Sequence, residues 1–334
     1  IVLSNLEVFD DETDRNTTEG EAKFLRALTY FDLVRLFSQR YDPDGANTQL
    51  GVPIVTEPVL DASAITYPSR STVQEVYDFV LSDLTDAYSL LPADNDYFAS
   101  KYSAQALLAR VYLEMGNYEG ARDAANEVIE ESGASLTTTF AEAFNNSENS
   151  SEDLFALQVT SQDESEQGYN VYWAGSDFGG RIGNPDISVN EVHFDNYDDT
   201  GDDRANFFYV TDDGTATTKW QNQFGNISLI RLAEMYLIRA EANERLATEV
   251  GATPLEDINT LRERANASLF DSVDLETILM ERRRELAFEG FALFDAKRLK
   301  MDVGDIDYNA DRLILPIPLR EIDANPELTQ NSGY

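Results

Sequence analysis

Two pairs of helix-forming segments limit this chain to a mainly helical fold. Residues 103–132 have the apolar spacing of two amphipathic helices, and Gly116 with Asn117 marks a short turn between them. A second pair covers residues 228–246 and 254–267 and has a longer connection. An amphipathic helix is stable when its apolar face is buried against a neighbouring element. The sequence therefore predicts a scaffold of packed helical hairpins.

The first pair resembles the tetratricopeptide hairpin in the order of its small and aromatic residues. Ala109, Gly116 and Ala121 stand where small side chains would let two helices approach closely. We therefore predict a mainly α fold, with a tetratricopeptide-like helical hairpin scaffold and a long, irregular, loop-rich excursion.

Further helices are indicated on both sides of a breaker-rich loop. Residues 19–37 are almost wholly apolar, which predicts a helix that is packed on nearly all sides. Another helix begins at Ser71, where Gln74 stands in the capping-box position, and ends before Pro92. Between the two helices, residues 41–70 contain many Pro and Gly residues, which predicts an ordered loop.

A long helix is predicted over residues 275–294, and it carries an unusual density of charge. Arg and Glu residues three or four positions apart can pair along one face of a helix. The interpretation that we favour is a buried network of ion pairs that fixes the packing of this helix. The charged residues are Glu281, Arg282, Arg283, Arg284, Glu285 and Glu289.

The excursion covers residues 145–226 and is rich in Asn, Ser, Gly and Asp, with single aromatic residues among them. Short strands are predicted at 154–160 and 206–211. Irregular segments of this length are usually functional or disordered. The aromatic content argues against disorder, because aromatic side chains supply a small core.

We interpret residues 1–334 as a single domain. Its helical scaffold covers about 1–144 and 227–300, and the ligand-binding excursion lies between these two parts. The tail, residues 301–334, contains three prolines and is predicted to wrap the scaffold as extended chain.

The charge of the chain excludes several classes of partner. The 62 acidic residues exceed the 25 basic ones, so the formal net charge is −37. Such a surface repels nucleic acids and anionic lipids, so no nucleic-acid partner is expected. Because few of the basic residues are lysine, the composition favours a protein that works in high salt, where charge repulsion is screened. An ordinary acidic secreted protein is the alternative.

The scarcity of cysteine, histidine and long apolar runs excludes several kinds of chemical site and a membrane-spanning helix. The chain contains no cysteine, which excludes disulfides, thiolate metal sites and a Cys nucleophile. His193 is the only histidine, so multi-histidine metal sites are excluded and a Ser–His catalytic system would depend on this one residue. No run of 18 apolar residues is present.

Four segments in this order resemble the SusD/RagB family of outer-membrane nutrient-binding lipoproteins, and together they extend over essentially the whole chain. The segments are GEAKFLRALTYFDLVRLF at 20–37 with GVPIVTEPV at 51–59, YSAQALLARVYLEMGNYEGARDAANEVI at 102–129, ISLIRLAEMYLIRAEA at 227–242 with ERRRELAFEGFALFDAKR at 281–298, and LPIP at 315–318 with NPELTQNSGY at 325–334.

The resemblance implies a non-catalytic protein that captures glycans on the outer face of the outer membrane. Such a protein would be lipid-anchored and would deliver an oligosaccharide to a TonB-dependent porin of the SusC type. Together with the acidic composition, the resemblance implies a halophilic bacterium of Bacteroidetes type. The N-terminal region and the lipidated cysteine that are usual in the family are not present in this sequence, so we expect any contact with the membrane to depend on an anchor outside it.

Aromatic residues of the excursion are the candidate ligand contacts. A sugar presents an apolar C–H face and a ring of hydroxyl groups, so aromatic platforms flanked by polar side chains suit it. Each of these aromatic residues could instead anchor the excursion to the scaffold. The predicted ligand-binding residues are Tyr169, Asn170, Tyr172, Trp173 and Arg181, with Trp220 as a second platform and Tyr41 in the loop after the first helix.

Two acidic clusters have the hard oxygen atoms that Ca²⁺ prefers, but neither has the spacing of an EF-hand. They are Asp42 with Asp44, and the run Asp198, Asp199, Asp202 and Asp203. We favour solvated surface over a calcium site, and we expect no cofactor. Three alternatives to glycan capture remain: a scaffold that docks on the porin, a binder of a non-glycan nutrient such as a peptide and, least favoured, a glycoside hydrolase.

Overall fold

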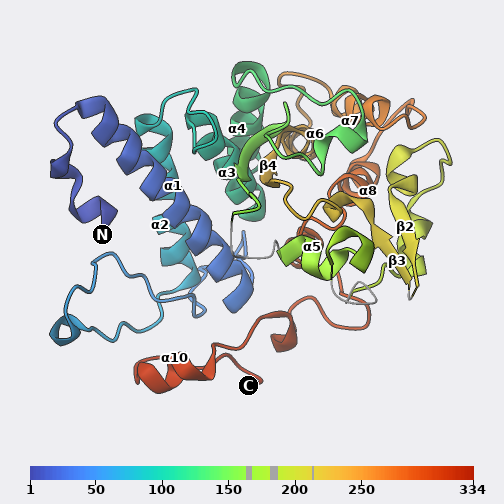
Figure 1. Ribbon diagram of the computed structural model, residues 1–334. Coiled ribbons are helices and arrows are strands. Elements are labelled where there is room, and N and C mark those ends of the chain that lie inside the picture. Colours follow the sequence, from blue (N-terminus) through green and yellow to red (C-terminus); the bar gives the residue numbers. More distant parts are fainter. Residues whose placement is uncertain (163–167, 181–186, 213) are drawn as a thin grey trace. The chain divides into compact units, whose positions relative to one another are not determined.

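The computed structural model contains two compact units, each described by itself below. Unit 1 combines Ile1–Asn117 with Ala292–Tyr334, and unit 2 is the continuous stretch Tyr118–Phe291. Most of the regular structure is helical, as predicted (Figure 1). Among the residues described, no helix is both long enough and apolar enough to cross a membrane. The residues described are 1–162, 168–180, 187–212 and 214–334.

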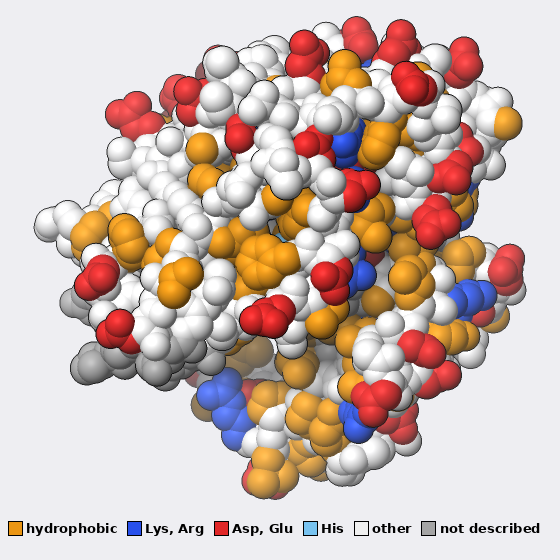
Figure 2. All heavy atoms as spheres, turned by 90° about the vertical axis from the view of Figure 1, so that its right-hand side faces the viewer, with side chains coloured by type: hydrophobic (Ala, Val, Ile, Leu, Met, Phe, Trp, Pro, Cys, Tyr) orange, Lys and Arg blue, Asp and Glu red, His pale blue; other side chains and the backbone are white. Residues whose placement is uncertain are grey.

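Acidic side chains are spread over the surface, as the composition requires. Figure 2 shows one face on which many Asp and Glu side chains surround apolar patches, with few Lys and Arg side chains among them. The excess of acidic residues is therefore distributed over the fold and is not confined to one tail.

In unit 1, two long helices pack side by side. Arg26 of α1 makes two hydrogen bonds, of 2.7 and 2.8 Å, to the carboxylate of Asp83 of α2, and Tyr30 meets Phe79 edge-on at 5.2 Å. The helices of this unit are α1 (Glu12–Phe37), α2 (Val73–Leu90), α3 (Lys101–Glu114), α9 (Ala292–Arg298) and α10 (Leu319–Ala324), with 3₁₀ helices η1 (Val2–Ser4), η2 (Leu6–Val8), η3 (Ala62–Ala64) and η9 (Asp311–Leu313).

The helix predictions in unit 1 are largely confirmed. From Gly20 to the end of α1, only Leu25 and Thr29 are exposed, so this helix is packed on most sides. The predicted cap of α2 is wrong by one residue. Thr72 and Glu75 form the capping box, because Thr72 has the extended backbone that an N-cap requires.

The turn predicted after residue 115 is also confirmed. Gly116 has a φ of +72°, a left-handed conformation that suits glycine, and its N–H donates to the carbonyl of Leu113. The turn ends α3, and α4 (Tyr118–Glu131) begins unit 2 two residues later.

The loop 41–70 and the C-terminal tail are held by a buried arginine. Arg70 donates to carbonyl groups of the loop and of Phe37, and also to Thr329 O and Asn331 Oδ1 of the tail. Asn331 in turn donates to Phe37 O at 2.9 Å. The prediction of a wholly extended tail is wrong, since η9 and α10 interrupt it.

Unit 2 combines helices with two small antiparallel sheets. Strand β1 pairs with β4, so that Ala156 lies opposite Ser228, and β2 pairs with β3. Beyond α4, its elements are β1 (Asp153–Leu157), α5 (Gly168–Trp173), β2 (Phe208–Thr211), β3 (Gly214–Thr217), β4 (Ile227–Arg231), α6 (Leu232–Leu246), α7 (Pro254–Arg264) and α8 (Leu275–Glu285), with 3₁₀ helices η4 (Phe140–Ala143), η5 (Ser176–Phe178), η6 (Glu191–Asn196), η7 (Asp203–Asn206) and η8 (Thr218–Trp220).

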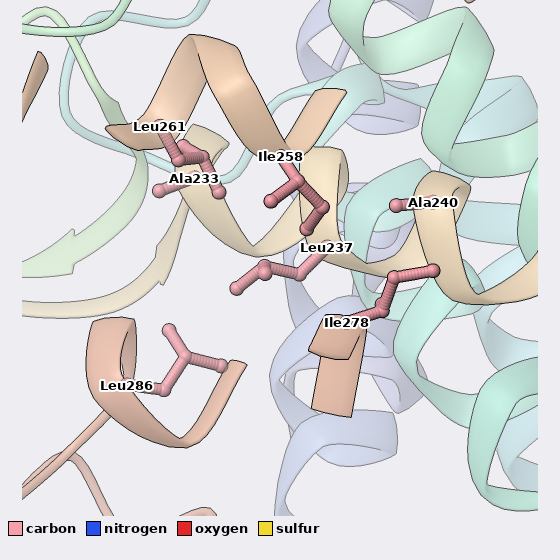
Figure 3. Close-up of a cluster of buried hydrophobic side chains, with 7 residues drawn as sticks. All are labelled: Ala233, Leu237, Ala240, Ile258, Leu261, Ile278 and Leu286. Atoms are coloured by element: carbon pink, nitrogen blue, oxygen red, sulfur yellow. The ribbon is translucent and has the colours of Figure 1, made fainter. Parts of the chain in front are cut away.

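Helix α6 is central to the core of unit 2 and packs against α4, α7 and α8. Figure 3 shows side chains from α6, α7 and α8 converging in one apolar cluster. Burying a side chain such as Leu237 stabilises the fold by about 1.5–3 kcal/mol. The cluster consists of Ala233, Leu237, Ala240, Ile258, Leu261, Ile278 and Leu286.

The structure corrects two predicted helices in unit 2. The segment 228–246 begins as strand β4, because residues 227–231 pair with β1, and becomes helical only from Leu232. The helix predicted over 275–294 stops at Glu285, because Phe288 and Gly290 adopt left-handed conformations with φ of +64° and +87°. The strands predicted at 154–160 and 206–211 correspond to β1 and β2.

Candidate functional site

Most of the predicted ligand-binding residues lie on one short piece of unit 2, residues 168–180, which we call the α5 segment. Its fold depends on Asn170, which is fully buried. The side-chain amide of Asn170 donates to the carbonyl groups of Phe178, Trp220 and Gln221 at 2.9–3.1 Å. The prediction that Asn170 contacts a ligand is therefore wrong for this structure: the side chain joins the α5 segment to residues 220–221.

Trp220, predicted as a second platform, is buried in the structure, where its side chain is only 5% exposed. Its indole Nε1 donates to Phe288 O at 3.0 Å. The ring of Tyr169 stacks on Trp220 with a centroid distance of 4.4 Å and an interplanar angle of 25°. Trp220 thus anchors the excursion and supports Tyr169, which is the alternative role considered for each aromatic residue.

The remaining rings of the α5 segment reach the surface to different degrees. Tyr172 is 42% exposed and Phe178 is 38% exposed. Trp173 is half-buried, and its ring meets Phe288 edge-on at 5.2 Å. Phe178 meets Tyr209 edge-on at 5.1 Å. The segment therefore offers exposed aromatic surface on a backbone that buried contacts hold in place.

Two of the predicted ligand contacts, Arg181 and Tyr41, are not among the described residues of the α5 segment. Arg181 lies outside the described residues. Tyr41 belongs to unit 1, where it is half-buried, packs against Tyr77 at 4.8 Å, and donates a hydrogen bond from its hydroxyl to Gln74.

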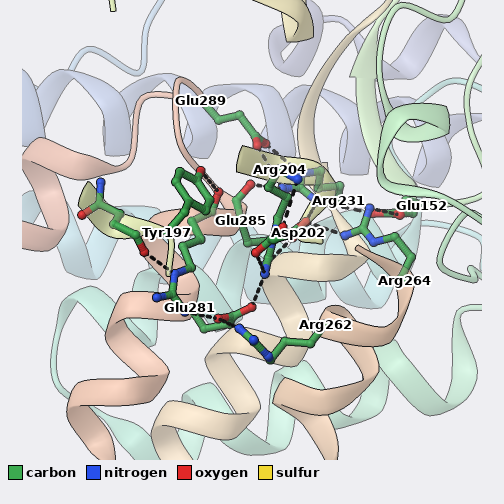
Figure 4. A network of polar contacts seen from close by, with 12 residues as sticks. Glu152, Tyr197, Asp202, Arg204, Arg231, Arg262, Arg264, Glu281, Glu285 and Glu289 are labelled. Atoms are coloured by element: carbon green, nitrogen blue, oxygen red, sulfur yellow. Dashed lines mark hydrogen bonds and ion pairs between the residues drawn. The ribbon is translucent and has the colours of Figure 1, made fainter. Parts of the chain in front are cut away.

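A buried network of ion pairs occupies the interior of unit 2. It confirms the predicted role of Glu281, Arg284, Glu285 and Glu289, whereas Arg283 is exposed. Glu285 is fully buried, and its carboxylate accepts from Arg231 and Arg264 and lies 3.3 Å from Arg204. Figure 4 shows this network at close range. Its members come from β4, α7, α8 and η7, from the residues just before β1 and η7, and from the turn after α8. They are Glu152, Asp202, Arg204, Arg231, Arg262, Arg264, Arg284, Glu281, Glu285 and Glu289.

The charges of the network keep Glu285 ionised although it is buried. Burial raises the pKa of a carboxyl group, but the guanidinium groups of Arg264, Arg231 and Arg204 outweigh burial and lower the pKa of Glu285. A buried carboxylate that is fully paired stabilises helix packing, and no exposed face of this group is offered to a substrate. We therefore assign the network a structural role.

Lys219 connects the network to the residues beside the α5 segment. Its buried ammonium group donates to Glu289 Oε1 at 2.6 Å and to Glu285 O at 2.9 Å. Burial lowers the pKa of Lys219 to about 8, although Glu289 opposes this shift. Its neighbour in the chain is Trp220, so one end of η8 contacts the ion pairs and also supports Tyr169.

His193 lies among aromatic rings, at 4.7 Å from Phe288 and 5.4 Å from Phe208. Burial lowers its pKa to about 4, and the positive charges of Arg283 and Lys219 act in the same direction. The imidazole is therefore neutral near pH 7, and it packs as one more ring of the cluster.

The acidic run at 198–203 is used within the fold. Asp202 pairs with Arg204 at 2.8 Å, and Asp199 accepts backbone hydrogen bonds from Gly201 and Ser268. In the part of the chain that the structure describes, no three His, Cys, Asp or Glu side chains form a group that could hold a metal ion.

The sequence did not single out Phe288 and Tyr209, which support Trp173 and Phe178 from outside the α5 segment. The one available signal was Gly290 in the motif FEGF, which could have marked a break in the helix predicted over 275–294.

Comparison with known proteins gives matches over the whole chain. Residues 95–334 match the model of the SusD family, and residues 1–113 match a family described as starch-binding associating with outer membrane. Among relatives, SusD-like protein P38 from Formosa agariphila is 27% identical over 94% of this chain and 73% of its own length. Starch-binding protein SusD from Bacteroides thetaiotaomicron is 32% identical over 36% of this chain and 26% of its own length.

Solved structures with the same fold are similar over nearly the full length of this chain. A SusD superfamily protein from Bacteroides thetaiotaomicron gives a TM-score of 0.82 at 29% identity, covering 98% of this chain and 82% of that protein. A laminarin-binding SusD-like protein gives a TM-score of 0.78 at 25% identity, covering 99% and 82% respectively. These likenesses confirm the predicted fold class.

Proposed function

Because the chain belongs to the SusD family, and similar proteins bind starch or laminarin, we propose that it captures oligosaccharides at the cell surface without cleaving them. The observation that carries this proposal is the exposed aromatic surface of the α5 segment, with Tyr172, Trp173 and Phe178. Aromatic rings suit the C–H face of a sugar. Rings that are already fixed by their neighbours lose little freedom when a ligand binds.

Polar groups beside these rings support the same function. Asp177 is exposed next to Phe178, and its carboxylate can accept hydrogen bonds from sugar hydroxyl groups. Tyr172 brings a phenol group that can donate as well as accept. Arg181 remains a predicted contact from the sequence.

In this role the protein delivers the oligosaccharide to a SusC-type TonB-dependent transporter. In this role a lipid anchor holds the protein at the extracellular face of the outer membrane. The match of residues 1–113 to a family associating with the outer membrane supports this location, as does the resemblance of the whole chain to the SusD/RagB lipoproteins.

Retardation in native gels that contain a polysaccharide tests glycan capture. The panel includes laminarin, soluble starch and a β-linked xylan, and the gels are run in molar salt to screen the acidic surface. We expect one polysaccharide class to retard the protein. Tyr172→Ala and Trp173→Ala should each weaken that binding at least about tenfold, since aromatic anchors dominate binding energies.

Tyr97→Ala is a matched control, because Tyr97 is a 58% exposed aromatic residue that is not a predicted ligand contact, so its loss should not affect binding. If no polysaccharide retards a protein that circular dichroism shows to be folded, glycan capture is refuted. A peptide ligand or a purely scaffolding role would then be favoured. Release of reducing ends from the bound polysaccharide would instead indicate a glycoside hydrolase.

A further inference from the structure

Phe288 has a backbone conformation that aromatic residues rarely adopt. Its φ of +64° places it in the left-handed region, where a side chain crowds the following carbonyl group. Residues persist in this conformation only when the surrounding structure enforces it, and such residues are concentrated at functional sites.

Residues on both sides of Phe288 in the chain are fixed by their own contacts and hold it in this conformation. On one side, Leu286 is only 3% exposed within the apolar core. On the other side, Glu289 makes hydrogen bonds of 2.8 and 2.9 Å with Arg231 and one of 2.6 Å with Lys219. The turn is therefore fixed between the core and the ion-pair network.

Phe288 uses this fixed position to contact both tryptophans of the chain. Its ring meets Trp173 edge-on at 5.2 Å, and its carbonyl accepts the hydrogen bond from Trp220 Nε1 at 3.0 Å. Trp220 stacks on Tyr169 at 4.4 Å. One left-handed residue thus supports Trp173 directly and Tyr169 through Trp220.

The Phe288 ring has little freedom to move away from Trp173. His193 meets it edge-on at 4.7 Å, and Phe208 does so at 5.7 Å. These two residues belong to η6 and β2, so three separate parts of the excursion pack around the same ring.

We propose that Phe288 is a positioning residue for ligand binding, through which the buried ion-pair network fixes the orientation of Tyr169 and Trp173 on the α5 segment. This inference rests on the proposed function, since it names the support of the same binding surface. Phe288 itself need not touch the ligand.

Two substitutions separate positioning from stability. Phe288→Leu retains an apolar side chain but removes the aromatic edge, and Phe288→Gly removes the ring together with the left-handed strain. An edge-to-face contact supports each ring only modestly, so we expect binding of laminarin or soluble starch to weaken roughly two- to tenfold in both variants. Ala247→Gly is the control, because Ala247 is also left-handed (φ +51°) but ends α6.

Acrylamide quenching of tryptophan fluorescence gives a second readout that needs no ligand. The chain has two tryptophans, so Trp173 can be followed alone in a Trp220→Phe background. We expect Phe288→Leu to increase the quenching of Trp173 while the urea midpoint remains close to that of the Trp220→Phe parent. Ala247→Gly should leave the quenching unchanged.

Weaker polysaccharide binding together with increased quenching would support the inference. Unchanged quenching in both Phe288 variants would overturn it, whatever their effect on binding. Loss of binding that is fully explained by a lower urea midpoint would also overturn it. If the unsubstituted protein binds no polysaccharide of the panel, xylan included, glycan capture fails, and the quenching experiment still decides whether Phe288 orients Trp173.

Discussion

Replacing Glu285 by glutamine should strongly destabilise unit 2, although the substitution hardly changes the size of the side chain. The carboxylate is fully buried and faces three arginines: Arg204, Arg231 and Arg264. Glutamine keeps the hydrogen-bond acceptor on one side but removes the negative charge. It also places an NH₂ group against guanidinium groups that can only donate.

The loss of stability expected for Glu285→Gln depends on which carboxylates remain to pair with its three arginines. Removing one member of a buried ion pair costs about 3–5 kcal/mol, because the other charge is left uncompensated. Each arginine keeps another carboxylate: Arg231 pairs with Glu289 at 2.8 Å, and Arg264 with Glu152 at 3.0 Å. We therefore expect the lower end of the range, about 3 kcal/mol.

Urea unfolding followed by tryptophan fluorescence measures this loss, since Trp173 and Trp220 both belong to unit 2. With a urea dependence of about 3 kcal/mol per molar, the midpoint should fall by about 1 M. The shift should persist in 1 M NaCl, because buried pairs are screened little.

Glu321→Gln is the control. Glu321 pairs with Arg320 at 2.8 Å, but the two side chains are 50% and 86% exposed, so the change should cost less than about 1 kcal/mol. A loss below about 1 kcal/mol for Glu285→Gln as well would refute the conclusion that Glu285 is an ionised centre of the network.

Three further predictions concern unit 2 and the acidic surface. Trp220→Ala should lower stability by about 3–5 kcal/mol in urea unfolding, because it leaves a cavity beneath Tyr169; a loss below about 1 kcal/mol would contradict its burial. Because the folded protein holds the pKa of His193 at about 4, the unfolded chain binds the extra proton first. Stability should therefore be lost as the pH falls from about 6.5 to about 4. For the half-buried ring, the loss of stability is about 1 kcal/mol. Urea unfolding of the unsubstituted protein and of His193→Phe at pH 7 and pH 4.5 isolates this loss. An equal loss in both proteins would contradict the lowered pKa of His193. Raising NaCl from 0.1 to 2 M should raise the thermal midpoint by about 3 °C or more, since the net charge of −37 repels itself; a flat or falling midpoint would count against adaptation to high salt.

The sequence predicted elements that depend on local signals better than contacts that depend on distant residues. Gly116 and the capping residues around 72–75 determine their own neighbourhoods, so the helix ends beside them were predicted to within a residue or two, whereas α1 begins at Glu12, seven residues before its predicted start. The break after α8 could not be predicted in the same way. The left-handed conformation of Phe288 is held by pairs between Glu289 and residues 58 and 70 positions away in the chain.

The two tryptophans illustrate why the candidate site was only partly predictable. Both were predicted as candidate platforms, with an anchoring role as the alternative for each; Trp220 stands directly among polar residues, and Trp173 has Asn170 and Asp177 nearby. The polar neighbour of Trp220 is Lys219, which is itself buried because Glu289 pairs with it. Without knowledge of that long-range pair, the polar neighbours of Trp220 give no sign that its ring is buried.

The division of the chain sets an order of assembly. Unit 2 is continuous in sequence, whereas unit 1 needs both ends of the chain, with Asn331 bonded to Phe37 across 294 positions. A growing chain that emerges from the ribosome or through a membrane pore can therefore complete unit 2 first. Until residues 329–331 have been synthesised, Arg70 lacks its contacts to Thr329 and Asn331, and Phe37 at the end of α1 lacks its contact to Asn331. We expect nascent chains of this protein to depend on protection of α1 and the loop after it until residues 329–331 have been synthesised.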